Sequence, residues 1–183
     1  MPAMLSETAT LSLIRRRRSD VAMSGRTGDW NAQTIAEFRL NHGKVGGPWK
    51  GAPLLLLNHI GARSGKPRVN PMMYLKDGDR YVVFASKGGA DTSPDWYYNL
   101  KGRPEVQIEV GDETIDVHAM EITGPERDRL YARQASLYPR FADYQRKTKR
   151  VIPVMALQPR AKQRGSLNPS DEEPPASNQA LAS

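Results

Sequence analysis

The chain has 183 residues, a formal net charge of +7 and no cysteine. This length suits one domain with a sizeable core, and the absence of thiols excludes disulfides, thiolate metal sites and cysteine catalysis. Residues 30–158 carry most of the charge excess, with 19 Lys and Arg against 14 Asp and Glu. We therefore expect the folded part to bind an anionic ligand.

Both ends of the chain are poor in apolar residues. We predict a disordered or weakly helical basic segment over 1–29, a folded domain over 30–158 and a disordered tail over 159–183. The run Arg15-Arg16-Arg17-Arg18 precedes no apolar stretch and does not match a secretory signal. No window holds the ~20 apolar residues of a membrane span. We interpret the run as a solvated cation cluster of a cytoplasmic protein, with peripheral attraction to anionic lipid at the inner membrane face as the alternative.

The apolar spacing predicts short elements in quick succession. In chain order we expect a helix over 30–41 capped by Asp29, a glycine-rich loop over 43–49, strands over 53–60, 67–76, 80–87, 104–110 and 113–122, a short helix over 96–100 between the third and fourth strands, helices over 124–137 and 143–150, and a strand over 151–157. Thr123 and Glu126 form a capping-box pattern, and Pro153 favours an edge or a bulge for the last strand. Many short antiparallel strands with few helices predict a mainly β, α+β fold of the small β-barrel type.

A cationic turn follows the apolar run Leu54-Leu55-Leu56-Leu57. Gly61 and Gly65 flank it, and it presents Arg63, Lys66 and Arg68 with the hydroxyl of Ser64. Cations and exposed backbone N–H groups on a tight turn suit a phosphate or a polycarboxylate. A solvated basic hairpin is the alternative. A P-loop is excluded because the glycine spacing is one residue short and a proline replaces the required hydroxyl, and no dinucleotide-binding glycine motif follows the first strand.

Two further stretches are expected to converge on this turn. One is the strand end Phe84-Ala85-Ser86-Lys87, which runs into a glycine pair, and the other is the aromatic-rich helix start Ser93 to Asn99. Together they offer a hydroxyl, an ammonium group and backbone donors to one anion. His42, His59 and His118 are scattered in loop and strand contexts, so we interpret them as structural and predict no metal site.

Four motifs carry a resemblance to a known family. They are Gly61 to Tyr74, the turn Ala85 to Ala90, the segment Pro94-x-Trp96-Tyr97-x-Asn99-Leu100, and Leu137-Tyr138-Pro139 with Asp143-Tyr144. In order and spacing they resemble the deazaflavin-dependent nitroreductase family of actinobacteria, over about residues 38–158. The resemblance implies a split antiparallel β-barrel of the FMN/F420-binding type that binds coenzyme F420, a 5-deazaflavin with a phosphate and an oligoglutamate tail. It further implies an enzyme, a reductase that transfers a hydride from reduced F420 to quinones and to nitroaromatic compounds.

The resemblance also implies site residues. The implied cofactor contacts are Ala62, Arg63, Ser64, Arg68, Val69, Asn70, Pro71, Met72, Met73, Phe84, Ala85, Ser86, Lys87, Asp95, Trp96, Tyr97, Tyr98 and Asn99. The implied substrate contacts are Met73, Ser86, Tyr138, Phe141 and Tyr144. Ser86 and Tyr138 are the candidate hydroxyl donors to negative charge that develops on the acceptor. We expect no essential base or nucleophile, because the cofactor supplies the difficult chemistry.

This chain departs from the family member that activates nitroimidazole prodrugs. It has Ala62 where that relative has a basic residue, Met73 and Phe141 where it has tyrosines, and Asp95 at an apolar position. These differences affect the expected identity of the acceptor more than the expected identity of the cofactor. A non-catalytic F420 or FMN carrier on the same barrel is the main alternative, and FMN fits the polycationic turn less well than F420. A nucleic-acid-binding barrel ranks last. Such a barrel would carry exposed aromatic residues that alternate with cations along its strands, whereas the tyrosines of this chain cluster in segments expected to be helical.

Overall fold

The computed structural model describes residues 30–161, and the predictions for residues 1–29 and 162–183 lie outside this part of the chain. In chain order its elements are a helix over 30–40, η1 (Gly47–Trp49), β1 (Leu54–Ile60), β2 (Pro67–Met73), β3 (Leu75–Asp77), β4 (Arg80–Phe84), η2 (Lys87–Gly89), α2 (Asp95–Gly102), β5 (Glu105–Val110), β6 (Glu113–Ile122), α3 (Gly124–Leu137), α4 (Arg140–Arg146) and β7 (Val154–Pro159). None of these described helices is long and apolar enough to cross a membrane.

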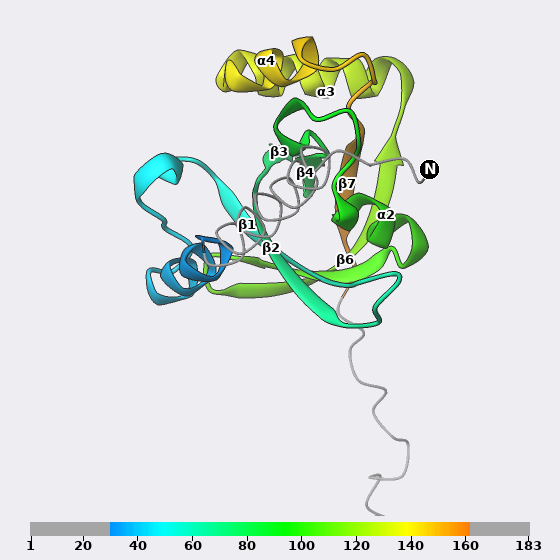
Figure 1. The fold of residues 1–183 in the computed structure, drawn as a ribbon. Helices are drawn as coiled ribbons and strands as arrows, with labels where there is room; N and C mark the ends of the chain where they lie inside the picture. The colour runs from blue at the N-terminus through cyan, green and yellow to red at the C-terminus, as the bar shows by residue number, and fades with distance from the viewer. Residues whose placement is uncertain (1–29, 162–183) are drawn as a thin grey trace, which may run out of the picture.

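The seven strands form one antiparallel sheet in the order β2-β1-β5-β6-β7-β4-β3. β2 and β3 therefore occupy opposite edges of the sheet. Only Tyr74 separates them in the chain, and its N–H donates to the carbonyl of Pro53 at 3.2 Å. Because one residue links the two edges, the sheet must curl until they meet (Figure 1). This confirms the predicted antiparallel, mainly β architecture of the barrel type.

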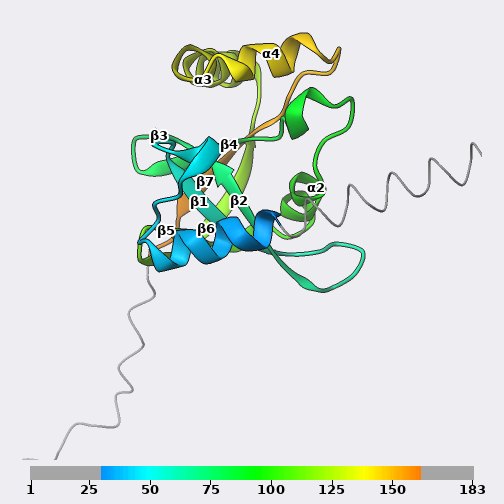
Figure 2. The same cartoon turned by 60° about the vertical axis from the view of Figure 1, so that its left-hand side comes forward.

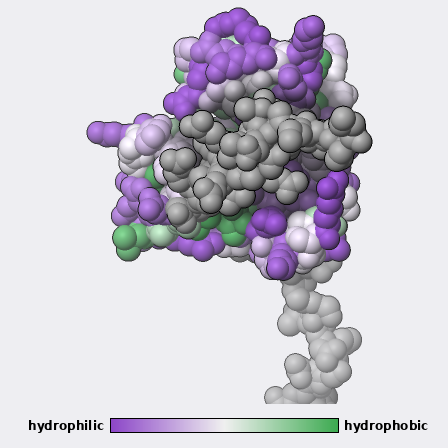
Figure 3. Space-filling model, viewed as in Figure 1, coloured by the Kyte–Doolittle hydropathy of each residue, from purple (hydrophilic) through white to green (hydrophobic). Residues whose placement is uncertain are grey.

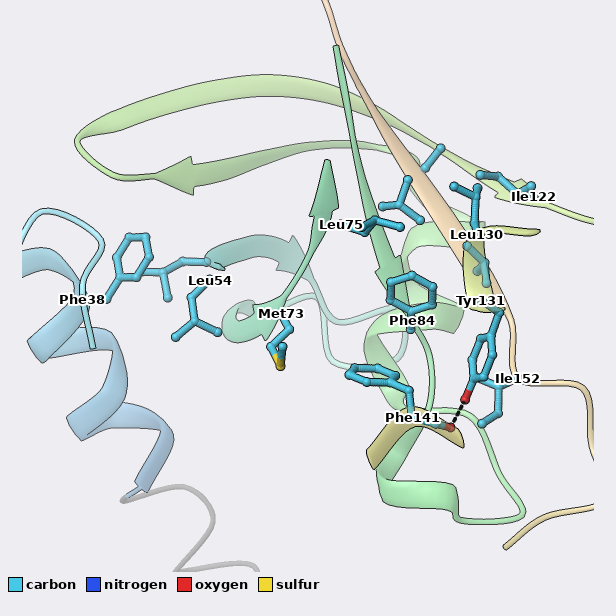
Figure 4. Close-up of a cluster of buried hydrophobic side chains, with 14 residues drawn as sticks. Phe38, Leu54, Met73, Leu75, Phe84, Ile122, Leu130, Tyr131, Phe141 and Ile152 are labelled. Atoms are coloured by element: carbon cyan, nitrogen blue, oxygen red, sulfur yellow. Dashed lines mark hydrogen bonds between the residues drawn. The ribbon is translucent and has the colours of Figure 1, made fainter. Parts of the chain in front are cut away.

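The sheet is buried on both faces. Along β1, Leu54 and Leu56 belong to one hydrophobic cluster, and Leu55 and Leu57 belong to a second. Successive side chains of a strand point to opposite faces, so an uninterrupted run of leucines indicates that both faces of the strand are buried. The first cluster includes side chains of α3 and α4 and is shown in Figure 4. The second cluster includes side chains of α2.

The helices occupy different sides of the sheet. α3 and α4 lie side by side at one end of the molecule, and the helix over 30–40 lies at the other end (Figures 1 and 2). Phe38 anchors that helix in the core, and Arg39 binds Glu109 of β5 through two hydrogen bonds of 2.8 and 2.7 Å. Hydrophilic side chains cover α3 and α4 in the view of Figure 3, as expected for helices that bury one face only.

Three predicted boundaries were wrong. The strand expected over 67–76 is broken at Tyr74, where the chain passes from one sheet edge to the other. The strand expected over 80–87 ends at Phe84, because Ser86 is already right-handed helical and Lys87 and the glycines after it have positive φ angles. The helix expected over 143–150 lies at Arg140–Arg146.

The last strand also corrects the sequence analysis. β7 begins at Val154 and lies between β6 and β4, so it is not an edge strand. Pro153 precedes the first ladder residue, where its missing N–H breaks no strand pairing, and its carbonyl accepts from the Ala85 N–H at 2.9 Å.

The predicted capping box at the start of α3 was wrong as well. Thr123 is the N-cap of α3 without a side-chain cap, and Glu126 binds Arg80 of β4 instead.

Candidate functional site

Two pockets lie on either side of the start of α2. The first, the aromatic pocket, has a volume of about 230 Å³ and is lined by Trp49, Pro71, Met72, Met73, Phe84, Ser86, Lys87, Gly88, Pro94, Trp96, Arg140, Phe141 and Tyr144. The second, the cationic pocket, has a volume of about 360 Å³ and is lined by Gly61, Ala62, Arg63, Ser64, Arg68, Asp95, Tyr98 and Asn99. Pro94 and Asp95 are consecutive residues at the start of α2, so the linings of the two pockets adjoin along the chain there.

The cationic pocket is built on a preformed turn. The Gly65 N–H donates to the Gly61 carbonyl at 2.8 Å, and the Gly61 N–H donates to the Lys66 carbonyl at 2.9 Å. Gly65 has a φ of 63°, which favours glycine. Arg63 and Arg68 are exposed and form no ion pair with any residue of the described part. Two guanidinium groups are thus available to an anion in this pocket.

A hydrogen-bond relay holds the turn from beneath. The Ala62 N–H donates to Asn99 Oδ1 at 2.8 Å, and Asn99 Nδ2 contacts His59 Nδ1 at 3.1 Å. His59 Nε2 contacts Asn70 Oδ1 at 2.8 Å. Since an amide nitrogen only donates, His59 Nδ1 accepts and Nε2 carries the proton. The Ala62 N–H is therefore engaged within the protein and is not one of the free backbone donors expected for the turn.

His59 is a structural residue, as predicted. Its side chain is buried, and both ring nitrogens have partners in the relay. Burial lowers the pKa of His59; the hydrogen bond to Asn70 opposes this shift, and the positive charge of Arg68 adds to it. The relay thus contains a neutral imidazole directly below the cationic turn.

One wall of the aromatic pocket is the turn after β4. Ser86 is right-handed helical, and Lys87 and Gly88 follow with φ angles of 47° and 66°. A right-handed residue followed by a left-handed one directs successive backbone N–H groups toward one point, which favours an anion there. The Lys87 ammonium donates to Thr92 Oγ1 at 3.1 Å. The Ser86 N–H itself donates to the Phe84 carbonyl at 2.8 Å. This wall thus combines a serine with a backbone conformation that favours an anion.

The facing wall is aromatic. Phe141 of α4 contacts Phe84 of β4 with ring centroids 5.5 Å apart and Tyr144 with centroids 5.4 Å apart. Tyr131 donates its hydroxyl to the Phe141 carbonyl at 2.8 Å, and this hydrogen bond fixes α4 on α3 (Figure 4). Burial raises the pKa of Tyr131 to about 12. The wall offers flat apolar surfaces that suit a planar ligand.

The structure distributes most of the sequence-predicted site residues over the two pockets, and some line neither. Ser86 and Lys87 do not share a pocket with the cationic turn, so the predicted convergence of both stretches on one anion is not seen. Tyr138 ends α3 and packs against the first hydrophobic cluster, outside the lining of both pockets. Four other candidates also line neither pocket, namely Val69, Asn70, Ala85 and Tyr97. Asn70 holds His59, and Tyr97 donates to Glu121 at 2.9 Å. Of these residues, Asn70 is linked to the cationic pocket through His59 and Asn99.

Other residues of the lining were missed. Trp49 enters the aromatic pocket from the glycine-rich loop and stacks on Trp30 with ring centroids 5.6 Å apart. A tryptophan directly after two glycines and a proline was the one signal in the sequence. Arg140 lines the same pocket from the first position of α4. No local pattern marks it, because its place depends on how α4 packs.

Comparisons with known proteins converge on one family. The sequence model of a family described as F420H(2)-dependent quinone reductase matches residues 30–159. An F420H(2)-dependent quinone reductase of Mycobacterium tuberculosis (strain H37Rv) is 40% identical over 128 residues, which are 67% of this chain and 85% of that protein. A second protein of the same strain, a putative F420H(2)-dependent quinone reductase, is 39% identical over 111 residues, 61% of this chain and 93% of that protein.

Solved structures agree with this result. A structure described as an F420-H2 dependent reductase (FDR-A) is 39% identical, with a TM-score of 0.54 over 58% of this chain and 94% of its own. A second structure, described as a domain-swapped dimer, is 35% identical, with a TM-score of 0.56 over 72% of this chain and 99% of its own. The fold is the split barrel that the sequence resemblance implied.

Proposed function

Because the chain belongs to the F420H(2)-dependent quinone reductase family, we propose that it is a reductase that uses the cofactor F420 to reduce a quinone-like acceptor. The observation that carries this function is the pair of adjoining pockets, one cationic and one aromatic. F420 combines a planar deazaflavin with an anionic tail, so a single molecule matches both. The non-catalytic carrier remains the alternative, and turnover distinguishes the two.

The residues of the cationic pocket fit the tail. Arg63 and Arg68 are two exposed cations on a preformed turn, and guanidinium groups bind phosphates and carboxylates through two parallel hydrogen bonds. Ser64 adds a hydroxyl at the same turn. In this proposal Ala62 and Asn99 shape the floor of the pocket, since their polar groups bind each other.

The residues of the aromatic pocket fit the ring and the acceptor. Bound reduced F420 supplies the hydride. Met73, Phe141 and Tyr144 exclude water and orient a flat acceptor. The Ser86 hydroxyl and the backbone donors of the turn after β4 are placed to stabilise negative charge that develops on the acceptor oxygen. The protein thus contributes orientation and electrostatics rather than a nucleophile.

We extend the proposal to nitroaromatic acceptors, which are also planar and gain negative charge on oxygen during reduction. The decisive experiment incubates the purified chain with F420H2 and either menadione or a nitroimidazole, and follows the return of F420 absorbance. Turnover with menadione supports the reductase, and tight F420 binding without turnover supports the carrier. FMN offered in competition decides the cofactor. Liposome sedimentation tests the prediction of lipid contact by the run Arg15–Arg18, which lies outside the described residues.

A further inference from the structure

Arg150 follows α4 and directs its guanidinium group into the segment between β4 and α2. Its Nε donates to the Ala90 carbonyl at 2.8 Å, and its Nη2 donates to the carbonyls of Ala85 and Ser86 at 2.9 and 3.0 Å. Its Nη1 donates to Ser93 Oγ at 3.2 Å. One side chain therefore binds four groups of a single loop.

That loop contains the polar wall of the aromatic pocket. Ser86, Lys87 and Gly88 line the pocket, and Lys87 is a non-glycine residue with a positive φ of 47°. Such a conformation is unfavourable and persists only where the surroundings impose it. Arg150 binds the two carbonyls immediately before Lys87 and so helps to impose it.

The same segment of chain is fixed to the aromatic wall. A Cβ atom on Gly89 would lie 2.8 Å from the carbonyl oxygen of Tyr144, so the loop and α4 touch through their backbones. Gln145 of α4 donates from Nε2 to the Arg150 carbonyl at 2.7 Å. Arg150 thus connects the wall that carries Ser86 with the wall that carries Tyr144.

Arg150 forms no salt bridge with a carboxylate in the described part of the chain, although Asp91 lines a surface pocket together with it. Arg39, Arg80 and Arg127 each pair with a carboxylate, whereas every hydrogen bond of the Arg150 guanidinium goes to a neutral oxygen. A cation bound behind Ser86 favours negative charge on the pocket side of the same wall. Arg150 itself does not line either pocket.

We propose that Arg150 is a positioning residue of the reductase: it holds Ser86, Lys87 and Gly88 in the geometry that stabilises charge on the acceptor, without touching cofactor or acceptor. The inference rests on the proposed function. It predicts that loss of Arg150 affects the chemistry through Ser86, rather than through the overall fold.

The test uses the full chain with F420H2 and menadione, and normalises each rate to the active sites counted by F420 titration. Since a misplacement of about 1 Å can cost about a hundredfold in rate, Arg150→Ala should lower kcat/KM by about ten- to a hundredfold per active site. Arg150→Lys, which keeps the charge and loses the planar fork, should restore part of this. Arg146→Ala is the matched control and should leave kcat/KM unchanged, because within residues 30–161 this exposed cation pairs with Asp143 alone and lines neither the aromatic nor the cationic pocket.

Two further readouts separate positioning from general stability. In a double-mutant cycle, Arg150→Ala should cost less in a Ser86→Ala background than in the wild type, because both changes act on one group. Amide hydrogen exchange of cofactor-free protein should accelerate over residues 85–93 and stay unchanged over β1.

Normal kcat/KM per active site, multiplicative effects of the two substitutions, or uniformly faster exchange would each overturn the inference. If Arg150→Ala does not fold, Arg150→Lys carries the same three readouts. Failure of the wild type to bind F420 would instead refute the proposed function, and the hydrogen exchange would still decide whether Arg150 fixes the loop.

Discussion

At the scale of single residues, the structure separates two neighbouring cations of one turn. Arg68 lines the cationic pocket and Lys66 does not. A charge-assisted hydrogen bond contributes about 1.5–3 kcal/mol, and exposure of Arg68 reduces this. We therefore expect Arg68→Ala to weaken F420 binding about tenfold, and Arg68→Lys to recover part of the loss. Lys66→Ala is the matched control and should change the Kd little.

Fluorescence titration at two salt concentrations measures this prediction. Screening acts over ~8–10 Å at 0.1–0.15 M ionic strength, so salt should weaken the wild type more than Arg68→Ala. A tail-less deazaflavin should bind weakly, and its affinity should be the same for the wild type and for Arg68→Ala. Equal losses for Arg68→Ala and Lys66→Ala would show that the turn is only a solvated hairpin.

His59 gives a prediction on pH and stability. Its pKa is lowered in the folded protein, mainly by burial, so the folded state binds fewer protons than the unfolded state below about pH 6.5. The stabilisation is complete above the unfolded pKa and is lost as the pH falls through it toward the lower folded value. Urea unfolding between pH 5 and 8 should show this loss, and His59→Gln should reduce the slope. An unchanged slope in the variant would contradict the prediction.

At the scale of elements, α4 rather than the end of α3 lines the aromatic pocket, where we propose that the acceptor binds. Tyr144 of α4 lines the aromatic pocket, whereas Tyr138, the donor expected from the sequence, lies outside it. Tyr144→Ala should therefore lower kcat/KM for a quinone more than Tyr138→Ala does, because it removes a surface on which the acceptor packs. Both variants should keep F420 affinity within a few-fold. A larger loss of kcat/KM in Tyr138→Ala than in Tyr144→Ala would instead support the Tyr138 hydroxyl as the donor.

At the scale of the whole molecule, the folded unit should bind cofactor without the ends of the chain. Every described residue that lines the two pockets lies between Trp49 and Tyr144, and the sequence outside residues 30–161 is poor in apolar residues. We expect a shortened chain of residues 30–161 to fold and to bind F420 within a few-fold of the full chain. Circular dichroism and fluorescence titration measure both properties. A tenfold loss of affinity would assign part of the site to an end.

Local sequence patterns were sufficient to predict the structure where adjacent residues determine it. The leucine run predicted a strand, Gly61 and Gly65 predicted the turn, and the cations in and directly after the turn predicted an anion site. Each depends on strand alternation, on positive φ at glycine or on charge, which a few adjacent residues determine. The cofactor did not follow from these patterns themselves; it was implied by the resemblance of four motifs to a known family.

Only the tertiary structure decided which side chains meet. Trp49 and Arg140 reach one pocket from opposite halves of the chain, and Pro153 directly precedes the central strand β7, where its carbonyl accepts from the Ala85 N–H. Arg150 and Ala85 are 65 residues apart in sequence, yet the guanidinium binds that carbonyl. Such contacts depend on the curl of the sheet and the packing of α4 on α3. No local pattern encodes them, because their energy arises only once distant segments are already in contact.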